Sequence, residues 1–76
     1  MATFTRTDKQ RAMTNARQEI AQIEGQDTQI QMEIMAERAR GYIEALMIMG
    51  AISQPEYVQL LREMVEVESL ELSAHS

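Results

Sequence analysis

Apolar residues recur every three or four positions over most of the chain, which is the spacing of one face of an α-helix. No segment alternates strictly between apolar and polar residues, as a half-buried strand would. The most frequent residues include Ala, Glu, Gln, Met, Leu and Arg, which are all good helix formers. The sequence therefore predicts an all-α fold.

The first expected helix runs from about residue 8 to residue 49, with Thr7 as its N-cap. Gly25 is its one doubtful point. The glycine either ends a helix, with Asp27 or Thr28 capping the next one, or lies inside a single long helix. The apolar positions keep their helical phase across Gly25, which favours the single helix, and a break at Gly25 is the alternative.

This long segment carries two apolar faces. The first is a stripe that we expect to form an oligomer interface: Ile20, Ile23, Ile30, Ile34, Gly41, Ala45 and Ile48. The second face appears only after residue 31 and consists of Met32, Met35, Ala36, Ala39, Tyr42, Ile43, Leu46, Met47 and Met49. Because one neighbour cannot cover both faces, we expect a second copy of the chain to bury the stripe, giving a homodimer.

The sequence MIMGAISQPEY, residues 47–57, predicts a tight corner between two helices. A glycine just beyond an apolar run ends a helix in the left-handed conformation, and an isoleucine two residues later folds back over the last turn. A serine followed three residues later by a glutamate is a capping box, and a proline in the first turn loses no helical hydrogen bond. The corner consists of Gly50, Ile52, Ser53, Pro55 and Glu56.

A second helix is expected from about residue 54 to residue 71. The short connection makes it an antiparallel neighbour of the first helix, so that the chain forms a helical hairpin. Two hairpins would dimerise into a four-helix bundle with coiled-coil packing. We expect residues 1–76 to be a single domain whose ends, 1–7 and 73–76, are disordered tails.

The stretch IEALMIMGAISQPEYVQLLREM, residues 43–64, resembles the short C-terminal (SHOCT) domains found at the ends of many bacterial proteins. It covers about a third of the chain. The matching positions are Leu46, Gly50, Ile52, Ser53, Glu56, Tyr57 and Leu60. Pro55 departs from the usual pattern. The resemblance implies a helical hairpin that can oligomerise and that carries no catalytic residue.

Charge is unevenly distributed along a chain whose net charge is −5. Basic residues gather near the N-terminus, and these are the candidate contacts to a partner: Arg6, Lys9, Arg11 and Arg17. Acidic residues gather near the C-terminus: Glu63, Glu66, Glu68 and Glu71. The overall acidity disfavours nucleic acid as the main partner. The basic residues form either a solvated surface or a docking surface for an acidic protein.

The sequence offers little chemistry. It has no cysteine, and its one histidine, His75, lies next to the last residue, so we expect no metal, no cofactor and no catalytic residue. The longest run without a charge, residues 45–55, is far shorter than the roughly 20 residues of a membrane span. The N-terminus has no apolar stretch typical of a secretory signal, so we expect a cytoplasmic protein.

These observations favour a small non-enzymatic interaction protein. We expect a homodimeric adaptor or inhibitor that binds another protein, of the kind that phages and plasmids encode. The alternative is a nucleic-acid-associated regulator that uses the basic arm Arg6–Arg17. The sequence shows neither two short helices joined by a turn, as in DNA-binding motifs, nor a cluster of aromatic residues on which bases could stack. The alternative is therefore the weaker hypothesis.

Overall fold

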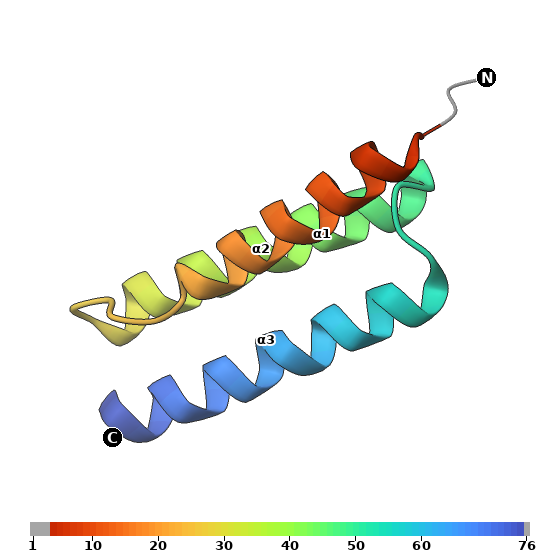
Figure 1. The fold of residues 1–76 in the computed structure, drawn as a ribbon. Coiled ribbons are helices and arrows are strands. Elements are labelled where there is room, and N and C mark those ends of the chain that lie inside the picture. The colour runs from red at the N-terminus through yellow and green to blue at the C-terminus, as the bar shows by residue number, and fades with distance from the viewer. Residues whose placement is uncertain (1–3, 76) are drawn as a thin grey trace.

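The computed structural model describes residues 4–75, which form three helices lying along one another (Figure 1). The helices are α1 (Arg6–Ala21), α2 (Gln29–Met49) and α3 (Gln54–His75). The chain reverses direction after α1 and again after α2, and the bundle measures 46 × 18 × 17 Å. All three pairs of helices are in contact. The described residues contain no strand, so the all-α class is confirmed.

The long helix expected over residues 8–49 is wrong, and the structure has the alternative break at Gly25. Gly25 has a φ of +76°, in the left-handed region that glycine adopts without a Cβ clash. Thr28 then caps α2. Its hydroxyl accepts a hydrogen bond from the Gln31 N–H at 3.1 Å, and the Gln31 side chain accepts one from the Thr28 N–H at 3.3 Å. Residues 4–75 therefore form three helices rather than two.

The first helix begins two residues earlier than the sequence pattern predicts. Its N-cap is Thr5 rather than Thr7. The Thr5 hydroxyl accepts a hydrogen bond from the Asp8 N–H at 3.0 Å, and the Asp8 carboxylate accepts one from the Thr5 N–H at 3.1 Å. Aspartate can therefore close the capping box, so the first turn lies ahead of the predicted start.

Both ends of the chain are more helical than expected. Of the expected tail 1–7, Arg6 and Thr7 belong to α1, and of the expected tail 73–76, residues 73–75 belong to α3. Residues 1–3 and residue 76 lie outside the described residues.

The corner residues singled out in the sequence lie in the connection between α2 and α3, residues 50–53, and in the first turn of α3. Gly50 has a φ of +81°, and the Ala51 N–H donates to the Leu46 carbonyl at 2.9 Å. Ser53 caps α3: its N–H donates to the Glu56 carboxylate at 2.8 Å, and its hydroxyl accepts from the Glu56 N–H at 3.3 Å. Pro55 is the second residue of α3, a position whose missing N–H has no helical partner. Ile52 is buried against the core.

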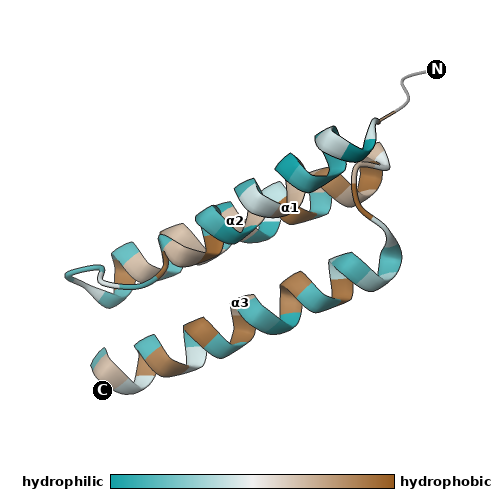
Figure 2. Ribbon diagram, viewed as in Figure 1, coloured by the Kyte–Doolittle hydropathy of each residue, from teal (hydrophilic) through white to brown (hydrophobic). Residues whose placement is uncertain are grey.

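The core is entirely apolar within the described part of the chain. Its residues are Ala12, Ala16, Ile20, Ile23, Met32, Ala36, Ala39, Ile43, Leu46, Ala51, Ile52, Leu60 and Met64. Alanines supply much of the buried surface of α1 and α2, and the larger buried side chains come chiefly from α2 and α3. Figure 2 shows hydrophobic bands on each helix and a hydrophobic start to the connection between α2 and α3. Small residues allow α1 and α2 to approach closely.

Matched glycine substitutions test the backbone argument. Gly50→Ala should lower the free energy of unfolding by about 1 kcal/mol, because alanine is strained at a positive φ. Gly41→Ala should raise it by about 0.5–1 kcal/mol, because alanine is the better helix former inside α2. Neither new Cβ would meet an atom within 4 Å, so the difference is conformational. Urea denaturation at low protein concentration measures both. Equal effects of the two substitutions would contradict the assignment.

Candidate interaction surfaces

The outer face of α2 carries a row of exposed isoleucines. The exposed fractions of Ile30, Ile34 and Ile48 are 70%, 57% and 81%. Gly41 and Ala45 lie on the same side of the helix and are also exposed. The opposite side of α2 is buried against α1 and α3. This row, which we call the α2 outer face, consists of Ile30, Ile34, Gly41, Ala45 and Ile48.

The other two residues of the predicted stripe are not part of this face. Ile20 and Ile23 are buried within the chain, with exposed fractions of 5% and 0%. They turn inward because the break at Gly25 lets α1 fold back onto α2. The stripe is therefore split into a portion that fills the core and a portion that faces solvent.

Three ion pairs join the helices, and each connects a different two of the three helices. Their members are Arg17–Glu63 between α1 and α3, Arg38–Glu19 between α1 and α2, and Arg40–Glu68 between α2 and α3. The shortest distances are 3.0, 3.1 and 3.6 Å respectively. Because they lie on the three seams between the helices, they favour the observed pairing.

The Arg17–Glu63 pair has the most complete geometry. The Nε and an Nη of Arg17 donate to the two carboxylate oxygens of Glu63 at 3.0 and 3.1 Å. The Arg17 hydrogen bond holds the pKa of Glu63 below its ordinary value, and a hydrogen bond from Gln59 adds a smaller effect. Arg17 is therefore engaged within the chain.

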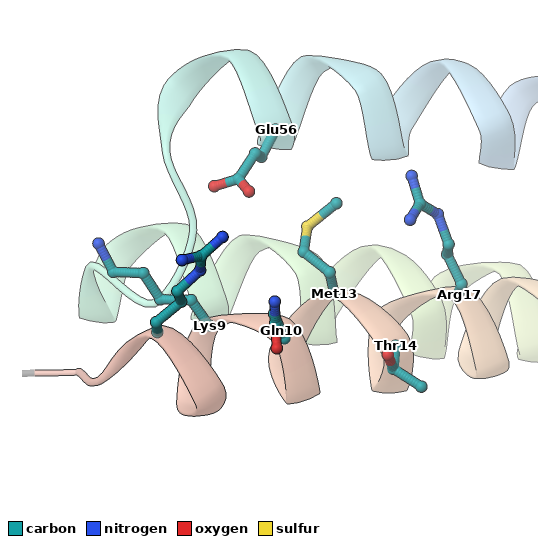
Figure 3. Close-up of a pocket in the computed structure, with 7 residues that line it drawn as sticks. Lys9, Gln10, Met13, Thr14, Arg17 and Glu56 are labelled. Atoms are coloured by element: carbon teal, nitrogen blue, oxygen red, sulfur yellow. The ribbon is translucent and has the colours of Figure 1, made fainter.

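A shallow groove of about 600 Å³ lies between α1 and α3. Its walls consist of Arg6, Lys9, Gln10, Met13, Thr14 and Arg17 from α1 and Glu56 from α3. Figure 3 shows Met13 and Arg17 extending from α1 toward α3, and Glu56 extending from α3 toward α1. We call this feature the α1–α3 groove. Sequence reasoning missed it because it depends on how α1 and α3 pack, although the spacing of Arg6, Lys9, Met13 and Arg17 already places them on one helix face.

The four candidate basic residues do not form one continuous surface. Arg6, Lys9 and Arg17 line the α1–α3 groove. Arg11 lies in a separate depression between α1 and α2, where Phe4, Tyr42 and Met49 supply apolar surface. The arm expected from the sequence is therefore divided between two sides of α1.

The perturbed carboxylates of Asp8 and Glu56 serve the helix caps. The pKa of Asp8 is lowered by hydrogen bonds from the Thr5 N–H and hydroxyl, and that of Glu56 by the equivalent groups of Ser53. Lys9 adds a smaller electrostatic effect on Glu56. Such shifts report local capping rather than acid–base catalysis.

The described residues offer neither a metal site nor a membrane-spanning helix. No group of three or more histidine, aspartate and glutamate side chains in this part of the chain could hold a metal ion. None of the helices over residues 4–75 has a segment long and apolar enough to cross a bilayer. The surfaces that remain to be explained are the α2 outer face and the α1–α3 groove.

The pH dependence of stability tests the Arg17–Glu63 pair. A carboxylate whose pKa is lowered by folding stabilises the protein above its unfolded pKa, and this stabilisation disappears as the pH falls through the folded pKa. Glu63→Gln should therefore reduce the loss of stability below about pH 4. We expect an effect below about 1 kcal/mol, because both side chains remain in contact with water. Thermal unfolding from neutral to acidic pH measures it.

Glu66→Gln is the matched control for this measurement. Glu66 lies on the same helix, is exposed and makes no ion pair among the described residues. It should leave the pH profile unchanged. Identical profiles for Glu63→Gln and Glu66→Gln would show that the ion pair contributes nothing to acid sensitivity.

Comparisons with known proteins do not assign the chain to a family. No protein-family model matches it, and no curated protein or solved structure is significantly similar to it. The resemblance of residues 43–64 to SHOCT domains therefore stays a prediction from the sequence. The candidate surfaces have to be judged on their own geometry.

Proposed function

We propose that the protein is a small helical interaction protein that self-associates through the α2 outer face. The observation that carries this proposal is the alignment of Ile30, Ile34 and Ile48 on the solvent side of a helix whose other side already fills the core. Isolated exposed apolar residues are common on protein surfaces, but three isoleucines aligned along one helix are typical of an interface.

The free energy available on this face is substantial for a small domain. Complete burial of one isoleucine side chain contributes about 1.5–3 kcal/mol. Three of them are more than half exposed, so pairing would remove most of this surface from water. Gly41 and Ala45 lie between the isoleucines and would let two helix backbones approach closely. A two-fold pair is the simplest way to bury a self-complementary face.

The assembly proposed here differs from the four-helix bundle expected from the sequence. The described part of each chain supplies three helices rather than a two-helix hairpin. In a pair formed through α2, the two α2 helices would lie at the centre, and α1 and α3 of each chain would lie outside them. This arrangement also keeps the α1–α3 groove of each chain accessible, since the groove has no lining residue from α2.

We further propose that the dimer acts on another protein as an adaptor or inhibitor. Its carboxylates with a lowered pKa, those of Asp8, Glu56 and Glu63, are engaged in helix caps and an ion pair. Its two distinctive surfaces, one apolar and one basic, are suited to binding other molecules. An adaptor needs separate surfaces for self-association and for a partner. The α2 outer face and the α1–α3 groove are built from different helices and fit this requirement.

Ile34→Glu should dissociate the dimer. A carboxylate in the middle of the buried face would lose its hydration without gaining a partner, so we expect the dissociation constant to rise at least about tenfold. The fold should survive, because the side chain of Ile34 is 57% exposed in the single chain. Sedimentation equilibrium over a range of protein concentrations measures the association, and circular dichroism checks the fold.

Leu70→Glu is the matched control for this experiment. Leu70 is also a large apolar residue, 72% exposed, but it lies on α3 and outside the α2 outer face. This variant should associate as the wild type does. A wild type that remains monomeric at high micromolar concentration would refute self-association, and equal weakening by both variants would refute the assignment of the interface to α2.

A further inference from the structure

The α1–α3 groove combines an apolar centre with unpaired positive charge on one wall. Met13 is half-buried and extends across the groove toward α3 (Figure 3). Arg6 and Lys9 are exposed and make no ion pair among the described residues, whereas Arg17 is held by Glu63. Glu56 is the only acidic residue that lines the groove, and its carboxylate accepts the Ser53 N–H at 2.8 Å. The groove therefore presents two cations without an ion pair among the described residues beside an apolar surface, and Lys9 is near enough to Glu56 to attract its carboxylate.

These two cations are placed where they weaken the helix that carries them. Arg6 is the first residue of α1 and Lys9 follows one turn later. The N-terminal end of a helix carries partial positive charge, so cations there are unfavourable and acidic side chains are favourable. Neither residue recovers this cost through an ion pair within the described part of the chain. A role in binding accounts for the two positions, because local rules are most often broken at functional sites.

We propose that the α1–α3 groove binds an acidic segment of another protein. Carboxylates of this segment would pair with Arg6 and Lys9, and an apolar side chain would cover Met13. The positive wall is complementary to such a segment although the protein as a whole has a net charge of −5. The inference rests on the proposed adaptor role, for which it names the chemistry of the partner, but it does not depend on self-association.

The composition of the groove favours a peptide over a phosphate backbone. A nucleic acid presents a charge at every phosphate and is held by many cations along its length. Among the described residues the groove offers only two cations outside an ion pair, Arg6 and Lys9, and two carboxylates, those of Glu56 and Glu63, belong to α3. An apolar centre next to two cations matches instead a segment in which acidic and apolar side chains share one face.

The probe for this proposal is a fluorescein-labelled, end-capped peptide of about 12 residues, roughly the length of α1 from Arg6 to Arg17 when helical. It carries glutamates and leucines on one helical face, and a second peptide carries glutamines in place of the glutamates. Fluorescence anisotropy with the full-length protein should show binding of the first peptide that weakens as salt is added. The glutamine peptide should bind at least about threefold more weakly.

Arg6→Glu should weaken binding of the acidic peptide about tenfold, because it replaces attraction with repulsion. Arg62→Glu is the matched control: Arg62 is an exposed arginine on α3 outside the groove, and it makes no ion pair among the described residues. Because Arg62 lies outside the groove, its substitution should change the affinity for the peptide by less than about twofold. The two variants change the net charge equally, so a general effect of charge would weaken binding in both. Arg6→Glu also places an acid in the first turn of α1, so its melting temperature should not fall. Loss of binding would then not reflect unfolding.

Three results would overturn the proposal. One is the absence of binding of the acidic peptide to the wild type at millimolar concentration. Another is equal loss of affinity in Arg6→Glu and Arg62→Glu, which would indicate net charge rather than a site. The third is tighter binding of a duplex DNA of the same total charge than of the peptide. Ile34→Glu should bind the peptide as the wild type does, so failure of the groove and failure of self-association are distinguishable.

Discussion

Two left-handed glycines, Gly25 and Gly50, set the direction of the chain at the two ends of α2. Each lies where a helix has ended and the next one has to start in the opposite direction, and a side chain at either position would be strained. Thr28 and Ser53 follow them as caps, so each reversal is completed within a few residues. The packing of α1 and α3 against α2 depends on these two turns.

Once α1 lies against α2, an apolar side chain is buried or exposed according to whether a neighbouring helix covers it. Ile20 and Ile23 enter the core, and the alanines of α1 and α2 allow the two helices to approach closely. The α2 outer face is left without a neighbour, because α1 and α3 both pack on the other side of α2. Its exposure therefore follows from the packing of the three helices over residues 4–75, and it is the reason to propose self-association.

Charge has a similar dependence on packing. Basic residues gather on α1 and acidic residues on α3, and the contact between these two helices places some of them opposite each other. Arg17 and Glu63 meet and neutralise one another, whereas Arg6 and Lys9 have no ion-pair partner among the described residues. The α1–α3 groove thus differs from the rest of an acidic protein. Because the groove and the α2 outer face are built from different helices, the protein has room for two kinds of contact at once.

The sequence by itself determined the helical class, the corner at Gly50 and the half of α2 that is buried. These features depend on neighbouring residues: a glycine after an apolar run, a serine three positions before a glutamate, and apolar residues at helical spacing. The break at Gly25 could not be decided in this way. The apolar positions keep their helical phase across the turn, and a glycine inside a helix lowers its stability by only about 1 kcal/mol. Tertiary packing decided it, since only a reversed α1 can place Ile20 and Ile23 beside Met32 in one core. The α1–α3 groove was equally beyond the sequence, because its two walls lie about forty residues apart and meet only when all three helices are in place.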